Sequence, residues 1–372
     1  MPVSLSGDLR RGGWQLSCQN LGDSDAVSAG LNILTKGKSL SGFSDLIPRR
    51  AMNGHVTARP DFSFDRFSSQ GSFQVATIDA ILSGLDLQDI SFAVVASPSN
   101  AHEATSWSFS TIIQHILKHH TNVIYDADGS DGSPEGVITA LDFDADSTLF
   151  DTVGDNFIVG HSENVWSVLQ TVGGGEEGGG EYHRIWCDRR NVIHYQPAPP
   201  FISPTPTSKG TLTKEHIRGT VQVRFNNSQP GQRIGQVKMV SGINPSTIFK
   251  SRYPASKTRG KVLRKTSGVW AEDQTQANLY AQRLYKWLTR SWTITIEVDA
   301  GLVLFGDTGR GLDLGDRLLI TYNGPAEDTA TGNGVHLNLS ATSAYVYGVN
   351  VNFDPARKSA TAFLTLEHDN SA

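Results

Sequence analysis

The clearest pattern along the chain is a two-residue alternation of apolar and polar side chains. It is cleanest beyond residue 210, where Val221, Val223 and Phe225 alternate with Thr220, Gln222 and Arg224. Successive side chains of a strand point to opposite faces, so this period predicts half-buried strands. Further runs of the same kind lie at 237–239, 292–298, 335–341, 345–353 and 361–367.

Shorter strand candidates occupy the first 90 or so residues. The clearest are Gly13–Gln19, His55–Ala58 and Ser72–Leu82, with Gly, Ser, Asp and Asn between them. These turn residues predict short strands joined by turns.

Three stretches repeat with the period of a helix instead. Apolar residues recur at three- and four-residue spacing over 109–116, 165–172 and 277–288. Each spacing places one apolar stripe on a helix, and Ser106 or Ser108 is the expected cap of the first helix.

Between and after these helices the chain changes character. The stretch 173–181, "GGGEEGGGE", holds six glycines, whose backbone entropy opposes any regular element, so we expect a mobile tip. Residues 182–197 predict a hairpin with its turn at "DRRN". The proline-rich stretch 197–210 predicts a linker or edge crossing. Helix, tip and hairpin together predict a small α+β module.

Composition favours a β-rich protein that is rich in turns. The chain has 372 residues, with 38% hydrophobic residues and 37 glycines. This length predicts two or three domains. The strand-rich C-terminal part favours a small antiparallel barrel or sandwich, within an overall α+β class.

Charge and cysteine content exclude several classes of protein. Lys and Arg total 32 against 37 Asp and Glu, a formal net charge of −5, which argues against general nucleic-acid binding. Cys18 and Cys187 are the two cysteines and form no disulfide framework or zinc signature. No apolar run is long enough to span a bilayer, and the N-terminus has no apolar core of a secretory signal.

The histidines are the first candidates for chemistry. His115 and His119 lie four residues apart on one helix face, with His120 beside them, and that spacing can hold a metal. However, no Glu follows His115 as in a metalloprotease helix, and no third ligand is implied locally. We therefore expect a polar helix face whose imidazoles interact with the helix dipole, and no metal site.

Other candidates for catalysis are weaker. On a strand, His183 and Cys187 would point the same way but lie roughly 13 Å apart, too far for a nucleophile and its base. The stretch 306–315, "GDTGRGLDLG", is glycine-rich but lacks the Lys-Ser/Thr ending of a phosphate-binding loop. Acidic pairs such as Asp144/Asp146 and Glu176/Glu177 would suit a glycosidase, but such pairs are common in soluble proteins.

Two more segments invite ligand-binding interpretations. Residues 126–135, "DADGSDGSPE", resemble a calcium loop, but Asp131 stands where an EF-hand needs glycine, so a surface turn is the preferred interpretation. Residues 255–266 hold five basic residues, Lys257, Arg259, Lys261, Arg264 and Lys265. They predict a solvated loop, and the alternative is a surface for an acidic partner or a phosphate-bearing ligand.

The order of elements carries a resemblance. A helix with Ala277, Tyr280, Ala281 and Leu284 precedes a strand, followed by a Leu-x-x-Gly-Asp turn at 312–316 and terminal strands. This order resembles the C-terminal part of bacteriophage tail baseplate hub proteins and their relatives in contractile injection systems. The helix beginning near 109 and the helix-plus-hairpin of 163–197 resemble the module inserted in that family.

The resemblance implies an architecture. It implies two antiparallel β-barrels related to the tail-tube fold, with the small α+β module inserted between them. The first barrel would span 1–90, the module 91–205, and the second barrel 206–372, with the helix at 271–290 packed beside it.

The resemblance also implies a role and partners. Three copies would form a ring with a tail tube or distal tail protein on one side and a spike protein on the other, in contact with other baseplate proteins. DNA would pass through the lumen without specific binding, and no membrane insertion is expected. The implied location is the virion tail baseplate, assembled in the cytoplasm of the bacterial host.

Two other functions compete with this structural role. A tail-associated cell-wall hydrolase would need a nucleophile or an acid/base pair in a cleft. A distal tail or carbohydrate-binding adaptor would need exposed aromatic platforms, for which Trp107, Trp166, Trp186 and Trp270 are candidates. We predict a non-enzymatic protein with no catalytic, cofactor-binding or metal-binding residues.

Overall fold

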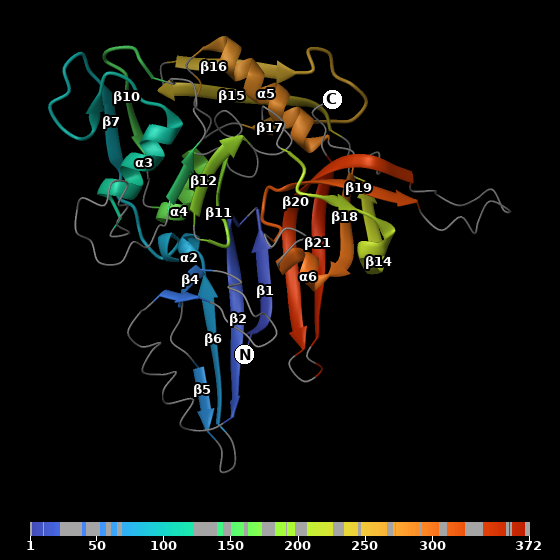
Figure 1. The fold of residues 1–372 in the computed structure, drawn as a ribbon. Helices are drawn as coiled ribbons and strands as arrows, with labels where there is room; N and C mark the ends of the chain where they lie inside the picture. The colour runs from blue at the N-terminus through green and yellow to red at the C-terminus, as the bar shows by residue number, and fades with distance from the viewer. Residues whose placement is uncertain are drawn as a thin grey trace. The chain divides into compact units, whose positions relative to one another are not determined.

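The computed structural model describes most strands and helices of the chain (Figure 1). The described residues are 2–9, 11–22, 39–41, 53–56, 61–64, 69–121, 140–143, 150–159, 163–172, 183–190, 192–197, 207–225, 234–244, 247–265, 271, 273–289, 292–304, 311–323, 338–354, 357 and 359–368.

Contacts divide the chain into two compact units, each built from segments far apart in the sequence. Unit 1 comprises Met1–Val75, Ile202–Phe225 and Arg290–Ala372. Unit 2 comprises Ala76–Phe201 and Asn226–Thr289. The predicted division into three consecutive domains stays a prediction.

Unit 1 is dominated by one large sheet. Its strands are β1 (Pro2–Asp8), β2 (Gly13–Gly22), β3 (Ser39–Ser41), β4 (Asn53–Val56), β5 (Asp61–Phe64), β6 (Ser69–Ala76), β13 (Thr211–Leu212), β14 (Ile217–Phe225), β18 (Trp292–Asp299), β19 (Arg317–Asn323), β20 (Asn338–Asp354) and β21 (Ser359–His368). Two short helices accompany it, η1 (Lys214–His216) and α6 (Ala300–Leu304).

The N-terminal and C-terminal strands of unit 1 belong to the same sheet. The strand order is β14-β18-β21-β20-β1-β2-β6-β4-β3, with β13, β19 and β5 paired off this path. Strand β1 pairs antiparallel with both β2 and β20 (Figure 1). From β14 to β2 each neighbouring pair on this path is antiparallel, and β13 pairs parallel with β19. The path of described strands does not close into a barrel.

Most of the predicted strands of unit 1 are confirmed, with two corrections. The described part of the run predicted at 335–341 and the run at 345–353 form one strand, β20, which continues through Ala341 at a φ of 47°. The C-terminal part of the run 72–82 is the helix α2 (Ile78–Leu82), because Ile78 and Leu82 lie one turn apart and are both buried.

Alternation along the strands places the core of unit 1 on one side of each strand. On β18, Ile294, Ile296 and Val298 are buried while the intervening Thr293, Thr295 and Glu297 are half-buried. Val349 and Val351 of β20 and Leu364 and Leu366 of β21 are also buried. Their burial removes apolar surface from water, which stabilises the folded sheet by roughly 25 cal/mol for each Å² buried.

Unit 2 combines helices with three small sheets. Its helices are α2, α3 (Phe109–His119), α4 (Val165–Val172) and α5 (Gln274–Leu288). Its strands are β7 (Ile90–Val94), β8 (Glu103–Ala104), β9 (Ala140–Phe143), β10 (Asn156–Val159), β11 (His183–Cys187), β12 (Val192–Pro197), β15 (Ile234–Asn244), β16 (Thr247–Tyr253) and β17 (Lys261–Lys265). The sheets have the orders β10-β7-β8, β11-β12-β9 and β16-β15-β17.

The predicted helices and hairpin of unit 2 are confirmed. Helix α3 starts where the Ser108 hydroxyl accepts from the N–H of Thr111, while the Thr111 hydroxyl accepts from the N–H of Ser108. Strands β11 and β12 form the hairpin, with Ile185 opposite Tyr195. The buried faces of α2, α3, α4, β7 and β11 share one hydrophobic core.

A second packing face lies along α5. The N–H of Gln276 donates to the side chain of Asp273, which caps this helix. Ala277, Ala281 and Leu284 are fully buried, as the apolar stripe predicts, and α5 packs on β15 and β16 (Figure 1).

Candidate functional site

The Leu-Asp-Leu-Gly-Asp turn at 312–316 is held by a set of connected hydrogen bonds. The Asp313 carboxylate accepts from the N–H of Leu314 at 2.9 Å, and Asp316 accepts from the N–H of Asp313 at 2.8 Å. Gly315 has a φ of 81°, a conformation in which a side chain would be strained. The N–H of Gly315 donates to the carbonyl of Val346 on β20, which attaches the turn to the sheet.

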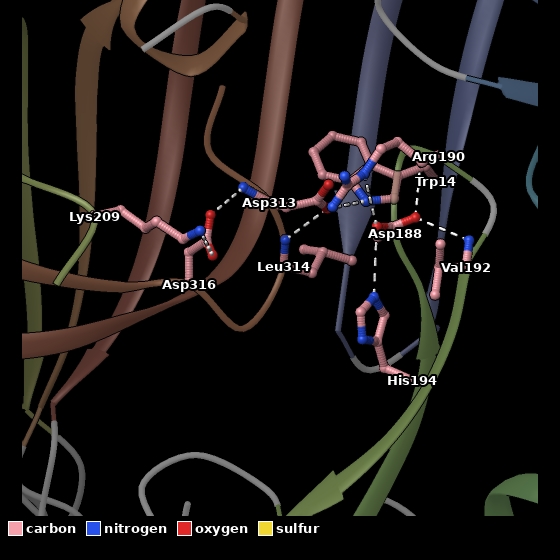
Figure 2. Close-up of polar contacts among 9 residues, drawn as sticks. All are labelled: Trp14, Asp188, Arg190, Val192, His194, Lys209, Asp313, Leu314 and Asp316. Atoms are coloured by element: carbon pink, nitrogen blue, oxygen red, sulfur yellow. Dashed lines mark hydrogen bonds and ion pairs between the residues drawn. The ribbon is translucent and has the colours of Figure 1, made fainter. Parts of the chain in front are cut away.

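The same turn binds an N-terminal tryptophan. The indole Nε1 of Trp14 on β2 donates to Asp313 Oδ1 at 2.9 Å, across 299 residues of sequence (Figure 2). Trp14 is fully buried and lies directly over Gly7, its partner on β1, where a Cβ would lie 2.6 Å from the ring. The turn therefore fixes the N-terminal hairpin to the C-terminal strands within unit 1.

In unit 2, a buried carboxylate organises the β11–β12 hairpin turn. Asp188 accepts from the N–H groups of Arg190 at 2.8 Å and Val192 at 2.9 Å, and its Oδ2 lies 3.5 Å from His194 Nε2 (Figure 2). Burial acts to raise the pKa of Asp188. The hydrogen bonds outweigh this effect and lower the pKa, and the largest contribution among them comes from His194.

Replacing Asp188 should therefore destabilise unit 2 in a pH-dependent way. We expect Asp188→Asn to cost about 1–3 kcal/mol at pH 7, since Asn cannot accept all of these hydrogen bonds. A lowered folded-state pKa adds stability above the unfolded pKa of about 4, and this stability is lost as pH falls through the folded pKa. Urea unfolding from pH 7 to pH 3 should show the difference shrink with acid.

The matched control is a carboxylate in an exposed turn. Asp354 accepts from the N–H of Arg357 at 3.1 Å, and its side chain is 43% exposed. Asp354→Asn should cost less than about 0.5 kcal/mol. An equal loss in both variants would contradict the role assigned to Asp188.

A histidine cluster lies at the C-terminal end of α3. Nε2 of His115 and Nδ1 of His102, in the loop before β8, are 3.2 Å apart. One side-chain nitrogen from each of His102, His115 and His120 lies within 4.8 Å of the others. His119 also adjoins His115, with ring centroids 4.6 Å apart. The helix sequence alone does not indicate His102, because this fourth imidazole comes from a loop.

The environment of this cluster favours neutral imidazoles. Burial lowers the pKa of His115 to about 4, with smaller contributions from His119, His102 and His120. Burial likewise lowers the pKa of His119 and His120. His115 is only 8% exposed and packs edge-on against Phe92 and Trp107, so the expected polar, dipole-stabilised position is wrong for this residue.

The other catalytic and aromatic candidates are largely buried. Burial raises the pKa of the Cys187 thiol well above its usual value, with the Asp79 carboxylate adding to the shift, and His183 stacks on Tyr195 instead. Cys18 and Cys187 are both free thiols. The tryptophans proposed as exposed platforms, Trp107, Trp166 and Trp186, are at most 6% exposed.

Several predicted features lie outside the described residues. They are the glycine-rich tip 173–181, the calcium-like loop 126–135, the acidic pairs Asp144/Asp146 and Glu176/Glu177, most of the linker 197–210, and Trp270.

The basic cluster is only partly a loop, and its members Lys257, Arg259, Lys261 and Arg264 are exposed. Lys261 and Arg264 belong to β17, which pairs with β15, so the loop interpretation is wrong for 261–265. Lys238 on β15 lies opposite Arg252 of β16 on one side and Arg264 of β17 on the other, and all three are exposed. The alternative of a surface for an acidic partner or phosphate-bearing ligand stays a prediction.

The described helices also bear on membrane insertion. None of them combines the length and the apolar character that crossing a bilayer requires.

Comparison with solved structures identifies the fold. A tail protein from Neisseria meningitidis superposes with a TM-score of 0.60 at 12% identity, covering 99% of this chain and 92% of that one. The chain has the fold of phage tail proteins. The 43 kDa tail protein of prophage MuSo2 from Shewanella oneidensis gives a TM-score of 0.59 at 11% identity, covering 100% of this chain and 94% of that one.

A secretion-system protein shares this tail-protein fold. It is a component of the type VI secretion system of E. coli, described as structurally similar to the T4 bacteriophage tail proteins gp27 and gp5. Its TM-score is 0.53 at 10% identity, covering 99% of this chain and 73% of that one. No family model matches the sequence, and no curated protein matches it either. The resemblance predicted from the order of elements is thus confirmed at the level of fold.

Proposed function

We propose that this chain is a structural baseplate hub of a phage tail. The observation that carries the proposal is the tail-protein fold, which extends over 99% of the chain rather than over one module. A fold alone does not determine a function, so the proposal also needs an assembly that suits it.

In this proposal three copies form a ring with a lumen. The ring joins the tail tube, or a distal tail protein, to a spike protein and contacts other baseplate proteins in the virion. Each copy contributes two tube-like barrels, at 1–90 and 206–372, with the module 91–205 inserted between them. DNA passes through the lumen without specific binding, which suits a net charge of −5.

The β14 edge of the large sheet supports assembly with other copies. Among the described strands β14 pairs only with β18, although it has nine residues. A long open edge presents backbone N–H and C=O groups that can pair with another chain. Along β14, Val221 and Val223 are half-buried while Thr220, Gln222 and Arg224 are exposed, so the strand is accessible from one face.

Two neighbouring proline substitutions test this edge. In an antiparallel pair, successive N–H groups alternate between facing the partner strand and facing away. Of Val221→Pro and Gln222→Pro, one therefore removes a hydrogen bond to β18, and the other removes a donor only from the open edge. We expect the variant that loses only the open-edge donor to keep its thermal stability yet to lose the trimer in light scattering.

The enzyme alternative makes the opposite prediction. A tail-associated hydrolase would cleave purified cell-wall material as a single chain, whereas the proposed hub has no such activity in any oligomeric state. A stable edge variant that stays trimeric would instead exclude β14 as the contact between copies.

A further inference from the structure

We propose that His102, His115 and His120 form a binding site for one divalent transition-metal ion of the zinc class. The ion would tie the loop before β8 to the C-terminal end of α3. All three residues belong to unit 2 of one chain, so the site requires neither a second copy nor the proposed hub function.

The spacing of the ligand atoms is close to what such an ion requires. Zinc binds histidine nitrogens at about 2.0–2.1 Å, so two ligands of a tetrahedral site lie about 3.4 Å apart. His102 Nδ1 and His115 Nε2 already lie 3.2 Å apart. All three ligand nitrogens lie within 4.8 Å of one another, so closure needs a shift of His120 of roughly 1.5 Å.

His120 carries an unsatisfied polar atom. Its Nε2 is buried and has no hydrogen-bond partner among the described residues. A buried nitrogen without a partner costs about 1–3 kcal/mol, and a metal bond would satisfy it. The ring centroid of His120 lies 5.3 Å from that of His102 and 5.4 Å from that of His115, so the three rings surround one small volume.

The loop that carries His102 is held in place before any ion binds. The Glu103 carboxylate accepts from the N–H and hydroxyl of Ser99 and from the amide of Asn100, each at 2.7–2.8 Å. The Asn100 side chain accepts from the N–H of His102, and the His102 carbonyl accepts from the N–H of Ala93 on β7. A fixed ligand loses little entropy on binding, which favours affinity.

On the helix side, packing fixes His115. Phe92 and Trp107 contact its ring edge-on, with centroids at 5.2 Å and 5.6 Å. His120 is anchored by its N–H, which donates to the carbonyl of Ile116.

Neutral imidazole is the form that binds a metal, and imidazole ligands suit Zn2+, Co2+, Ni2+ and Cu2+ rather than Mg2+ or Ca2+. Water would take the fourth position.

Metal titration of the full chain tests the site. The protein carries no histidine tag, is stripped with EDTA, and is titrated with Zn2+ by calorimetry and with Co2+ by visible absorption at pH 7.5. We expect one ion per chain, a tetrahedral Co2+ spectrum with nitrogen ligands, and a Zn2+-dependent rise in melting temperature.

Single variants identify the ligands. Removal of a residue that only supports a metal ligand typically weakens metal binding 10–100-fold, and removal of a ligand itself should cost at least as much. We therefore expect at least about tenfold weaker Zn2+ binding, and no melting shift, in each of His102→Gln, His115→Gln and His120→Gln. His119→Gln, on the same helix turn, is the matched control and should change affinity less than about threefold.

Each outcome decides the assignment. Because His120 is only half-buried, His120→Gln should fold normally, and its metal-free melting curve verifies this. Absence of stoichiometric Zn2+ or Co2+ binding by the wild type would overturn the proposal. So would retention of affinity in a folded His120→Gln variant, or an equal loss in His119→Gln.

Discussion

Trp14→Ala should destabilise unit 1 by about 3–5 kcal/mol, the range for truncating a fully buried tryptophan. Trp14 is 1% exposed and covers Gly7 on the neighbouring strand, so the substitution opens a cavity over Gly7. It also removes the indole donor to Asp313. Urea unfolding and amide hydrogen exchange of β1, β2 and β20 would measure the effect.

Trp14→Phe separates the two contributions of this residue. Phenylalanine keeps an aromatic ring over Gly7 but has no N–H, while Asp313 still accepts from the N–H of Leu314. We expect a loss of about 1–2 kcal/mol. If Trp14→Ala left exchange protection in β20 unchanged, the turn at 312–316 would not couple the N-terminal hairpin to the C-terminal strands.

Phe92→Ala should have a comparable effect in unit 2, about 3–5 kcal/mol. Phe92 is fully buried on β7, and its ring meets Trp107 at 4.8 Å and His115 at 5.2 Å. Aromatic pairs of this geometry add about 0.5–1.5 kcal/mol beyond the buried area. The measurement is the urea midpoint together with exchange protection along α3.

Ser91→Ala is the matched control on the same strand. Ser91 is exposed and shares a hydrogen bond with Asn156 on β10, so the change should lie within about 0.5 kcal/mol. Equal losses in Phe92→Ala and Ser91→Ala would contradict the assignment of Phe92 to the core of unit 2.

Local patterns predicted most elements because burial follows a short repeat. The stripe Ala277, Ala281 and Leu284 gives α5, and the alternation around Ile294 and Ile296 gives β18. The two corrections arise where local pattern is ambiguous. The repeat Ile78, Ile81 and Leu82 follows a strand without a break, and β20 passes through Ala341 with only one residue in an unusual conformation.

The local pattern of the sequence could not predict contacts between segments that lie far apart along the chain. The pairing of β1 with β20 depends on register between strands more than 300 residues apart. His102 reaches the cluster because the side chains of Asn100 and Glu103 shape its loop through hydrogen bonds, and no spacing relative to His115 indicates this. The Leu-Asp-Leu-Gly-Asp turn was visible in the sequence, but its partner, Trp14, was not.

The mass of the purified chain in solution, measured by light scattering during size exclusion, tests the proposed hub most directly. The hub proposal predicts a complex of three chains, alone or once tube or spike proteins are added, with the copies arranged as a ring in electron micrographs. A strictly single chain under all of these conditions, or a closed assembly without a lumen, would contradict it.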